Sequence, residues 1–513
     1  MEKLPWWTED QKKLADEIDD FMDELMPRID EAHWKEEFPW DAVEKLAQRG
    51  YFGAGVPKEY GGMGLGATGS AIIVEALGRL GPVGSILVNT LLGGLHQLIH
   101  FGTEAQREKW LPRIVAGELG GIGISEPFAG SDVAAVELTA RREGDVYVLA
   151  GKKRFVTGAG VVRKYLVYAR TSDSPEDIAR YRHLTAFMCE KDLPGLTVEK
   201  LNDFPGTVGF YNGYLNFDEV AVPAGDRIGE ENEGWRVSMV GLNFERIMSA
   251  AHAIGSLRDV LKTVLWYQNR RIQFGAPIID LQVNQFKIAD IITKMKVSRV
   301  FNYYAAYVFD SGIESPVDAS IAKLVSSDAV FECVVEAIQL MGGDGATKFY
   351  PVSRALMRAK IGQIAAGTSE IMKYLIFSRG MRELKDELRE FSRKWHRVIH
   401  EELKVPVRAL AGTGKRRLAS DEDLVRELAD DYRVNPGLYM LREDLTDRFE
   451  VEEDELDGML GSLEEGKLVK LHRDARGKMT HAKATYDGLR KMYPPEYYQW
   501  YPEWAIREKG LLL

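Results

Sequence analysis

The stretch GISEPFAGSD, residues 123–132, marks the point at which the chain changes from helical to strand-forming sequence. Before it, residues 8–118 carry apolar side chains three and four positions apart, and TEDQKKLADEIDDFMDELMPRID opens with Thr8, so we expect amphipathic helices with Thr8 as an N-cap. From 231 to 382 long helical periodicity returns. The order helix, sheet, helix predicts an α+β chain with an N-terminal helical domain over 1–118, a middle β domain over 119–230 and a C-terminal helical domain over 231–382.

The prediction of a middle β domain rests on short runs rich in β-branched and aromatic residues. Gly, Pro and Asp clusters bound these runs, as they would bound the strands of an antiparallel sheet or barrel. The runs are DVYVLAGKKRFVT (145–157), KYLVYART (164–171), LTAFMCE (184–190), LTVEKL (196–201) and YLNFDEVAV (214–222).

The composition is that of an ordinary globular protein and argues against several classes of function. Of the 513 residues, 45% are hydrophobic and 28% charged, and no run approaches the roughly 18 apolar residues of a membrane span. A net charge of −11 argues against a general nucleic-acid or anionic-membrane binder. Cys189 and Cys333 stand far apart and outside any metal-ligand spacing, so we expect no disulfide scaffold and no metal site. With no signal-peptide pattern visible, the expected location is the cytoplasm.

The last part of the sequence reads as a separate small module behind a linker. Residues 383–417 combine a charged helical connector with linker-like sequence. Within 418–513 the patterns predict helices over 442–449, 452–467 and 485–493 and two strands over 468–474 and 478–484. This order resembles a winged helix-turn-helix.

The charge of this module decides between two kinds of partner. Residues 411–513 hold 17 Lys and Arg against 22 Asp and Glu, whereas a DNA-binding module should be basic. The end of the chain, YPPEYYQWYPEW (493–504), is rich in Tyr, Trp and Pro, and aromatic residues are enriched at protein interfaces. We therefore expect a protein-contact module and no nucleic-acid partner.

Four further segments are ambiguous when each is taken alone. GLGATG (64–69) fits a dinucleotide-binding pattern but lacks a preceding strand, so a flexible glycine loop is the better interpretation. GISEPFAGSD could cradle an anion such as a pyrophosphate, or could be a plain turn. RRIQFGAP (270–277) and IQLMGGDGA (338–346) are structural breaks among helices by default.

Taken together and in order, eight segments of the chain resemble the acyl-CoA dehydrogenase family over residues 5 to about 382. The segments are GYFGAGVPKEYGGMG, FGTEAQREKWLPRI, GISEPFAGSD, KKRFVTGAG, GLNFERI, RRIQFGAPIIDLQ, QLMGGDG and AAGTSEI. The resemblance implies the acyl-CoA dehydrogenase fold, with a helical domain, a β-barrel or sheet domain and a four-helix bundle, usually assembled as a homotetramer. It also implies bound FAD, an acyl-CoA substrate and electron delivery to an electron-transfer flavoprotein.

The resemblance assigns cofactor contacts residue by residue. Ser125 and Ser131 match residues that approach the flavin, with Ser131 also near the pyrophosphate or the CoA moiety, and Thr157 matches the threonine whose hydroxyl bonds flavin N5. Phe155 stands where the family usually has Trp, which keeps a π-face for packing on the flavin. The effect of Phe128, which replaces a usually small residue, stays open. Contacts to the FAD of a neighbouring subunit and its diphosphate are matched by Arg271, Phe274, Gln282, Gln339, Gly342 and Gly343, and contacts near the adenosine half by Thr368 and Glu370.

Desaturation of an acyl thioester needs a base that removes an α-proton while the β-hydrogen leaves as hydride. A carboxylate in a dry pocket suits this role, because desolvation raises its pKa. Most of the family places a Glu directly before the Gly of the G-T-S turn, where this chain has Ala366 in IGQIAAGTSEIMKYL (361–375). The isovaleryl-CoA and long-chain branches carry the base within a motif like L-x-x-E-R instead, and Glu245 of GLNFERIMSA matches it.

Other residues of the site follow from the same resemblance. The backbone N–H of Ala366, next to Gly367, can still donate to the thioester oxygen beside a ribityl hydroxyl of FAD. Asn243 and Arg246 match residues near the CoA and the active-site wall.

Small residues predict the shape of the acyl pocket. Ala365 and Ala366 replace a large aromatic residue and a Glu, and Gly93 and Gly94 lie in a helix that lines the acyl tail in relatives. These positions favour a branched, cyclic or aryl-bearing acyl group, although close helix packing would also explain the two glycines.

Two other functions stay open at the level of sequence. The chain could be a relative that couples the oxidation to decarboxylation or elimination, and Glu245 argues against complete loss of α,β-oxidation. It could also resemble the DNA-associated flavoproteins of alkylation damage, against which the acidic C-terminal module argues.

Overall fold

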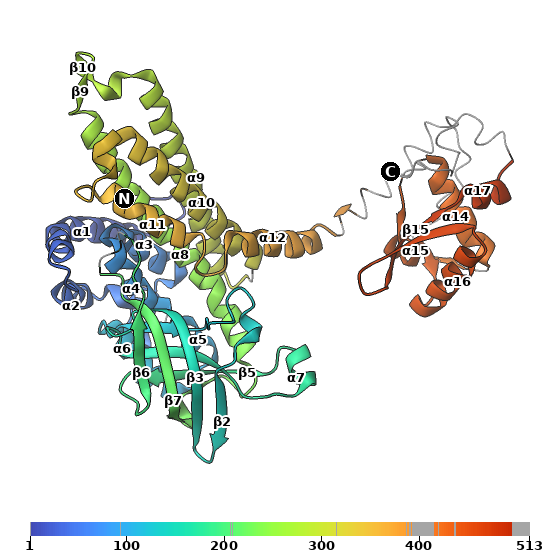
Figure 1. Cartoon of the computed structure of the whole chain (residues 1–513), viewed down its shortest axis with the longest axis horizontal. Coiled ribbons are helices and arrows are strands. Elements are labelled where there is room, and N and C mark those ends of the chain that lie inside the picture. The colour runs from blue at the N-terminus through green and yellow to red at the C-terminus, as the bar shows by residue number, and fades with distance from the viewer. Residues whose placement is uncertain are drawn as a thin grey trace. The chain divides into compact units, whose positions relative to one another are not determined.

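The chain forms two compact units in the computed structural model, Met1–Glu383 and Leu384–Leu513, which Figure 1 draws together. The structure describes residues 2–92, 94–205, 207, 209–313, 315–385, 387, 388, 391, 415–418, 420–434 and 438–494. None of the helices in these ranges is long and apolar enough to cross a membrane.

The first unit begins with helices. Thr8 caps the first of them in a capping box with Gln11, so the predicted N-cap is confirmed, and Thr103 and Gln106 repeat this arrangement. The helices are α1 (Glu9–Lys35), α2 (Trp40–Gln48), α3 (Gly66–Leu77), α4 (Gly81–Leu92), α5 (Leu95–Phe101) and α6 (Glu104–Val115).

The glycine motif GLGATG lies at the start of α3. Gly66 has φ +66°, and the carboxylate of Asp310 accepts from the backbone N–H groups of Ala67 and Thr68 over 2.6 and 2.9 Å. An acidic side chain therefore occupies the N-terminus of this helix, where a dinucleotide would place its pyrophosphate. The prediction of a flexible glycine loop is wrong for residues 66–69, because they form the first turn of α3.

A mixed sheet of eight strands follows, in the order β6-β7-β3-β2-β4-β5-β8, with β1 parallel to β4. All five predicted strand runs are confirmed, as β3 to β7, while β1, β2 and β8 are strands that the sequence patterns do not predict. The long strands β3 and β7 pair antiparallel, and their register places Thr157 opposite Asn212. The strands are β1 (Gly120–Gly123), β2 (Thr139–Glu143), β3 (Val146–Thr157), β4 (Lys164–Arg170), β5 (Leu184–Glu190), β6 (Leu196–Leu201), β7 (Asn212–Pro223) and β8 (Arg227–Ile228), and α7 (Pro175–Ala179) lies between β4 and β5.

Long helices complete the first unit. A short hairpin joins α8 to α9, and a glycine-rich 3₁₀ turn over Gly342–Ala346 joins α10 to α11, as the patterns predict. The elements are α8 (Gly234–Gln268), β9 (Ile272–Gln273), β10 (Ala276–Pro277), α9 (Gln282–Asp310), α10 (Pro316–Met341), α11 (Pro351–Gly362) and α12 (Ser369–Glu383).

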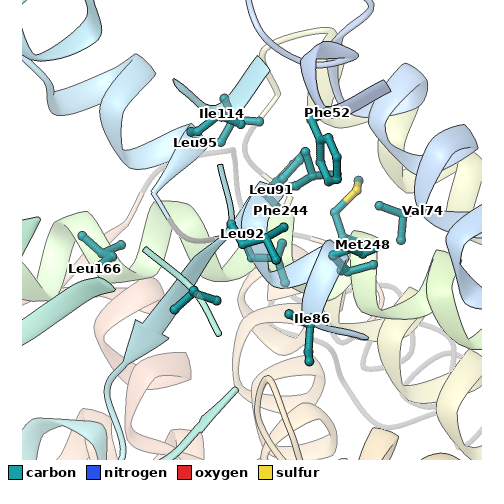
Figure 2. Close-up of a cluster of buried hydrophobic side chains, with 14 of the residues drawn as sticks. Phe52, Val74, Ile86, Leu91, Leu92, Leu95, Ile114, Leu166, Phe244 and Met248 are labelled. Carbon is teal, nitrogen blue, oxygen red and sulfur yellow. The ribbon is translucent and has the colours of Figure 1, made fainter. Parts of the chain in front are cut away.

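One apolar core joins the N-terminal helices, the sheet and α8. Figure 2 shows part of it, where buried side chains of α4 and α8 gather, including Leu92 and Phe244. The backbones of α3 and α8 approach so closely that a Cβ at Gly255 would lie 1.7 Å from the carbonyl oxygen of Glu75. This close packing fixes α8 relative to the helices before the sheet.

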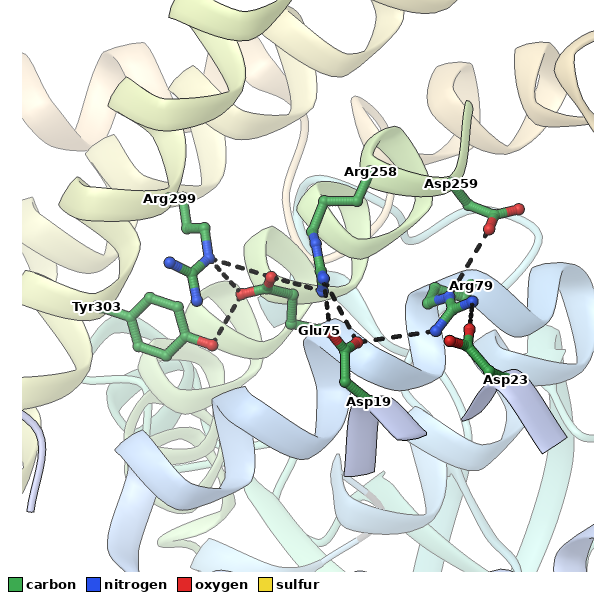
Figure 3. Close-up of polar contacts among 8 residues, drawn as sticks. All are labelled: Asp19, Asp23, Glu75, Arg79, Arg258, Asp259, Arg299 and Tyr303. Atoms are coloured by element: carbon green, nitrogen blue, oxygen red, sulfur yellow. Dashed lines mark hydrogen bonds and ion pairs between the residues drawn. The ribbon is translucent and has the colours of Figure 1, made fainter. Parts of the chain in front are cut away.

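A buried ionic network crosses the same interface (Figure 3). The Glu75 carboxylate is fully buried and accepts hydrogen bonds from Arg258, Arg299 and Tyr303 over 2.8 to 3.1 Å. Removing one partner of such a network leaves an uncompensated charge inside the protein, which is strongly destabilising. The network therefore holds α3 in one register against α8 and α9.

The second unit has its own apolar core. Helices and strands follow the predicted order over residues 442–493, and α14 before them is a helix that the patterns do not predict. The strand β12 extends the β14–β15 hairpin into a three-stranded antiparallel sheet. The elements are β11 (Arg416–Arg417), α14 (Asp421–Val434), β12 (Met440–Leu441), α15 (Arg442–Arg448), β13 (Phe449–Glu450), α16 (Glu453–Glu465), β14 (Val469–Arg473), β15 (Met479–Ala484) and α17 (Tyr486–Met492).

Candidate active site

The predicted base, Glu245, lies in the N-terminal third of α8. It keeps partial exposure while its neighbours Phe244 and Arg246 are buried. Desolvation raises the pKa of the Glu245 carboxyl to about 7, although the positive charges of Arg246 and Lys323 act in the opposite direction. A carboxyl with this pKa is half ionised near neutral pH, which suits a group that must both take up and release a proton.

The face of α8 that carries Glu245 stays polar for two further turns. Ser249 and His252 follow at spacings of four and seven residues, which place them on the same side of the helix. Ser85 of α4 brings its hydroxyl to 3.5 Å from Nε2 of His252. Asn243, one turn before Arg246, accepts a hydrogen bond from the Arg246 guanidinium over 3.0 Å.

The turn that lacks the usual carboxylate lies between α11 and α12. Ala366 has φ +57° and Gly367 has φ +92°, so two consecutive residues adopt the left-handed conformation. The backbone N–H of Ser369 closes the turn on the carbonyl of Gln363 over 2.9 Å. The hydroxyl of Thr368 accepts from the N–H of Ile371 over 3.2 Å and so caps the start of α12.

Lys323 of α10 connects this turn with Glu245. Its ammonium donates to the carbonyl of Gly367 over 2.7 Å, and its charge acts on the Glu245 carboxyl. The fold therefore brings Glu245, Lys323 and the Ala366 turn to one place from three elements, α8, α10 and the loop before α12.

Thr157 ends strand β3 with an oriented hydroxyl. The amide of Asn212 donates to Thr157 Oγ1 over 3.1 Å and to the carbonyl of Phe155 over 2.9 Å. The amide of Asn202 donates to Asn212 Oδ1 over 2.8 Å, which fixes the orientation of the Asn212 amide. Because the Thr157 oxygen accepts this bond, its own proton is available for an acceptor outside the protein.

Phe155 presents an aromatic face beside that hydroxyl. Its ring is 47% exposed, its φ is +56°, and the Arg154 guanidinium lies 4.1 Å from the ring centroid. A positive φ in a bulky residue is a strained conformation that functional sites often retain. A half-exposed ring next to a free hydroxyl donor fits an isoalloxazine ring, which offers a flat aromatic face and nitrogen acceptors.

A buried ion pair anchors the loop GISEPFAGSD to strand β3. The Lys153 ammonium donates to Glu126 over 2.5 Å, and the Glu126 carboxylate accepts from the backbone N–H of Leu138 over 3.0 Å. This anchor leaves Ser125 partly exposed and Ser131 exposed, where both hydroxyls can reach a ligand. Phe128 is 84% exposed, so its bulk lies outside the loop and does not disturb the loop's packing.

The residues expected to contact a neighbouring subunit's cofactor gather at one end of the helical bundle, away from the sheet (Figure 1). Gln268 of α8 donates to the Leu340 carbonyl at the end of α10 and accepts from Asn284 near the start of α9, which joins the hairpin and the glycine turn. Phe274 is 95% exposed with φ +52°. The whole group is exposed: Arg271, Phe274, Gln282, Gln339, Gly342 and Gly343.

The structure describes all but one of the remaining predicted residues. Ala365 and Glu370 are exposed beside the turn. Gly94 has φ +116° directly before α5, so it occupies a break between α4 and α5 and not a helix interior. Gly93 lies outside the described residues.

Sequence reasoning missed Asn212, Lys323 and Asp328, which all support the predicted residues. Lys323 and Asp328 stand in ASIAKLVSSDAV (319–330), whose other residues are small or apolar, and a lysine on a helix face that should be buried is a signal of a buried charge. Asn212 begins a strand, a position that asparagine rarely favours without a specific hydrogen bond.

Comparison with known proteins also finds the acyl-CoA dehydrogenase family along the chain. Models described as acyl-CoA dehydrogenase N-terminal, middle and C-terminal domains match residues 8–118, 121–220 and 232–381. An acyl-CoA dehydrogenase of Bacillus subtilis is 34% identical over 373 residues, 72% of this chain and 97% of that protein. A 3-(aryl)acrylate reductase of Clostridium sporogenes is 34% identical over 378 residues, 73% of this chain and 99% of that protein. The solved structure of butyryl-CoA dehydrogenase from Megasphaera elsdenii superposes with a TM-score of 0.70 at 33% identity, over 74% of this chain and all of that one.

Proposed function

This chain belongs to the acyl-CoA dehydrogenase family of FAD-dependent oxidoreductases, and from that premise we propose that it desaturates an acyl-CoA thioester with Glu245 as the base. The observation that carries the proposal is the pairing of a turn without a carboxylate, at Ala366, with a desolvated carboxyl on α8 whose pKa is raised to about 7. This base placement resembles that of the isovaleryl-CoA and long-chain branches of the family.

Each residue has one task in the proposed reaction. Glu245 removes a proton from the α-carbon, and the N–H of Ala366 donates to the thioester oxygen as negative charge develops there. The chemistry that FAD supplies when bound is acceptance of a hydride from the β-carbon. The Thr157 hydroxyl donates toward the flavin, Phe155 packs on its ring, and Ser125 and Ser131 reach its polar edge and pyrophosphate.

The acyl group is proposed to be branched, cyclic or aryl-bearing. Ala365 and Ala366 leave room where a large aromatic side chain and a Glu would stand. The polar face of α8 beyond Glu245 adds hydrogen-bonding groups at Ser249 and His252, with Ser85 opposite. A hydroxyl or carbonyl some distance from the thioester would give these groups a further hydrogen-bond partner, which a plain hydrocarbon does not supply. The name of the aryl-acrylate relative agrees with room for an aromatic group.

The assembly is proposed to be a homotetramer that passes electrons to an electron-transfer flavoprotein, as in the family. Large apolar side chains on α9 and α12 are exposed in the single chain, among them Phe286, Tyr307, Tyr374 and Phe377. Exposed patches of this kind mark protein contacts. The two buried, free thiols of Cys189 and Cys333 fit a reducing compartment such as the cytoplasm.

The second unit is proposed to be a winged-helix-like module over 418–513 that contacts protein. Helix α16 would occupy the position of a recognition helix, and its sequence EDELDGMLGSLEE is acidic. Like charges near a polyanion cost affinity, so this helix fits a protein partner and not duplex DNA. The aromatic-rich stretch that supports this prediction, 493–504, lies outside the described residues from residue 495 onward.

An anaerobic substrate screen tests the proposed function. The FAD-loaded enzyme is mixed with straight, branched, cyclic and aryl-bearing acyl-CoA thioesters, with and without a distal hydroxyl, and bleaching of the flavin absorbance is followed. We expect rapid bleaching by at least one branched, cyclic or aryl thioester, with the 2-enoyl thioester as product. A clear preference for octanoyl- or palmitoyl-CoA would contradict the acyl assignment. Release of carbon dioxide from a dicarboxylic thioester would support the decarboxylating alternative.

A further inference from the structure

Two residues of helix α10, Lys323 and Asp328, hold the Ala366 turn. Lys323, 1% exposed, donates its ammonium to the carbonyl of Gly367 over 2.7 Å. Five residues further along α10, Asp328 Oδ1 accepts from the Gln363 amide and from the Ser369 hydroxyl, both over 2.8 Å. The two ends of the turn and its centre are therefore tied to the same helix.

The turn needs such support because its backbone is strained. Ala366 has φ +57°, and a non-glycine residue keeps this sparsely populated conformation only where its surroundings over-determine it. The direction of the Ala366 N–H depends on the conformation of this residue and of its neighbour Gly367. A change in either would turn the donor away from the thioester oxygen.

A buried ammonium is an expensive way to bind one carbonyl. Taking a charged amine out of water carries a large desolvation free energy, and a neutral donor could bond the same oxygen with a smaller one. Burial lowers the pKa of Lys323 to about 8, and the carboxylates of Asp328, Glu245 and Glu370 counteract this effect while Arg246 adds to it. A cation at this place therefore points to a use for its charge as well as for its hydrogen bond.

We propose that Lys323 is a positioning residue of the desaturation, which aims the Ala366 N–H through the Gly367 carbonyl and faces Glu245 with a positive charge from α10. The inference rests on the proposed function. It assigns two separable effects to one side chain, because the hydrogen bond sets the geometry of the oxyanion donor and the charge favours the ionised base.

The charged and titratable groups around Glu245 come from three elements. The positive charges of Arg246, on the same helix, and of Lys323, on α10, act on the Glu245 carboxyl, and the charge of Glu245 acts on the buried Tyr168 hydroxyl of β4. Arg246 and Lys323 both lower the pKa of Glu245 against desolvation. Loss of the Lys323 charge leaves only Arg246, so the base should ionise at higher pH.

The test compares Lys323→Met with Lys323→Arg in the FAD-loaded holoenzyme, on the best thioester of the screen. Lys323→Met should lower kcat by about 10- to 100-fold, the scale of a small misplacement at a reacting centre, and should move the acid limb of the kcat profile to higher pH. Lys323→Arg keeps the charge, so the acid limb should stay in place and part of the rate should return. Lys294→Met is the matched control, since Lys294 also contacts α10, through Glu332 at the surface over 2.5 Å.

Two results would overturn the inference. One is a Lys323→Met enzyme with kcat within twofold of wild type and an unmoved acid limb, and the other is a loss that Lys323→Arg does not relieve. If Lys323→Met fails to fold, Asp328→Asn tests the same support of the Ala366 turn by α10. It should lower kcat without moving the acid limb to higher pH. An unchanged kcat would count against this support. Failure of the proposed function is distinguishable, because then no thioester reduces the flavin of the wild-type enzyme.

Discussion

The amide of Asn212 donates to the hydroxyl of Thr157 across the β3–β7 pairing, over 3.1 Å. Asn202 fixes the amide from the other side, so the Thr157 oxygen always receives a donor and its proton points elsewhere. A chain of three side chains, two of them outside the motifs that identify the family, thus sets the direction of a hydroxyl that we expect to bond flavin N5.

Asn212→Leu should weaken this bond without emptying the site. The change keeps the branched shape of the side chain but removes the amide, so the Thr157 hydroxyl can rotate and its bond to the flavin loses orientation. A hydrogen bond is worth about 0.5–1.5 kcal/mol net, which corresponds to a loss of about 2- to 12-fold in the rate of flavin reduction. The flavin absorbance maximum and the two-electron potential should shift with it. Asn216→Leu on the same strand is the control. Equal effects of both variants would argue against a role of the Asn212 amide in orienting the Thr157 hydroxyl.

Turnover should depend on pH through the Glu245 carboxyl. Its pKa is raised to about 7, and only the ionised form can accept a proton. The rate of flavin reduction should therefore rise as pH increases through about 7 and level off above it, opposite to a reaction that needs a protonated acid. The measurement is stopped-flow reduction from pH 5.5 to 9 with saturating thioester. A rate that is flat across this range, with a full kinetic isotope effect, would show that another group is the base.

Removal of the second unit should spare the chemistry. A chain that ends at about residue 410 retains every proposed site residue, and its first unit has its own core, so FAD should stay bound and thioesters should still bleach it. The oligomeric mass by light scattering, the thermal midpoint or the rate with a physiological electron acceptor should change, because we expect the module to contact protein. Tight binding of the full chain to duplex DNA at physiological salt, lost on truncation, would contradict this expectation.

The fold was largely predictable because its signals are local. The run DVYVLAGKKRFVT has strand composition along its whole length, and β3 spans nearly all of it. By contrast, β1 consists of GGIG, which has no β-branched pattern to detect beyond one isoleucine, and it becomes a strand only because β4 pairs with it. Pairing between distant segments is a tertiary effect that single-sequence patterns do not contain.

The site could be predicted only where a motif carries the residue. Glu245 and Ala366 follow from a segment match, whereas Lys323 and Asn212 act through backbone groups and hydroxyls far away in sequence. The position of Lys323 on an apolar helix face signals a buried charge, but nothing in the nearby sequence shows that its ammonium donates to the Gly367 carbonyl. The long-range hydrogen bonds that aim the predicted groups are therefore a finding of the structure.

The central claim, that Glu245 is the base, is tested most directly by α-proton exchange. A 3-thia-acyl-CoA has acidic α-protons and no hydrogen on the β-atom, so exchange into D2O reports proton removal alone, independent of hydride transfer and of the electron acceptor. The wild-type holoenzyme should exchange the α-protons rapidly by NMR, and Glu245→Gln, with FAD still bound, should exchange them at least about 10²-fold more slowly. Exchange by Glu245→Gln at more than a tenth of the wild-type rate would contradict the account.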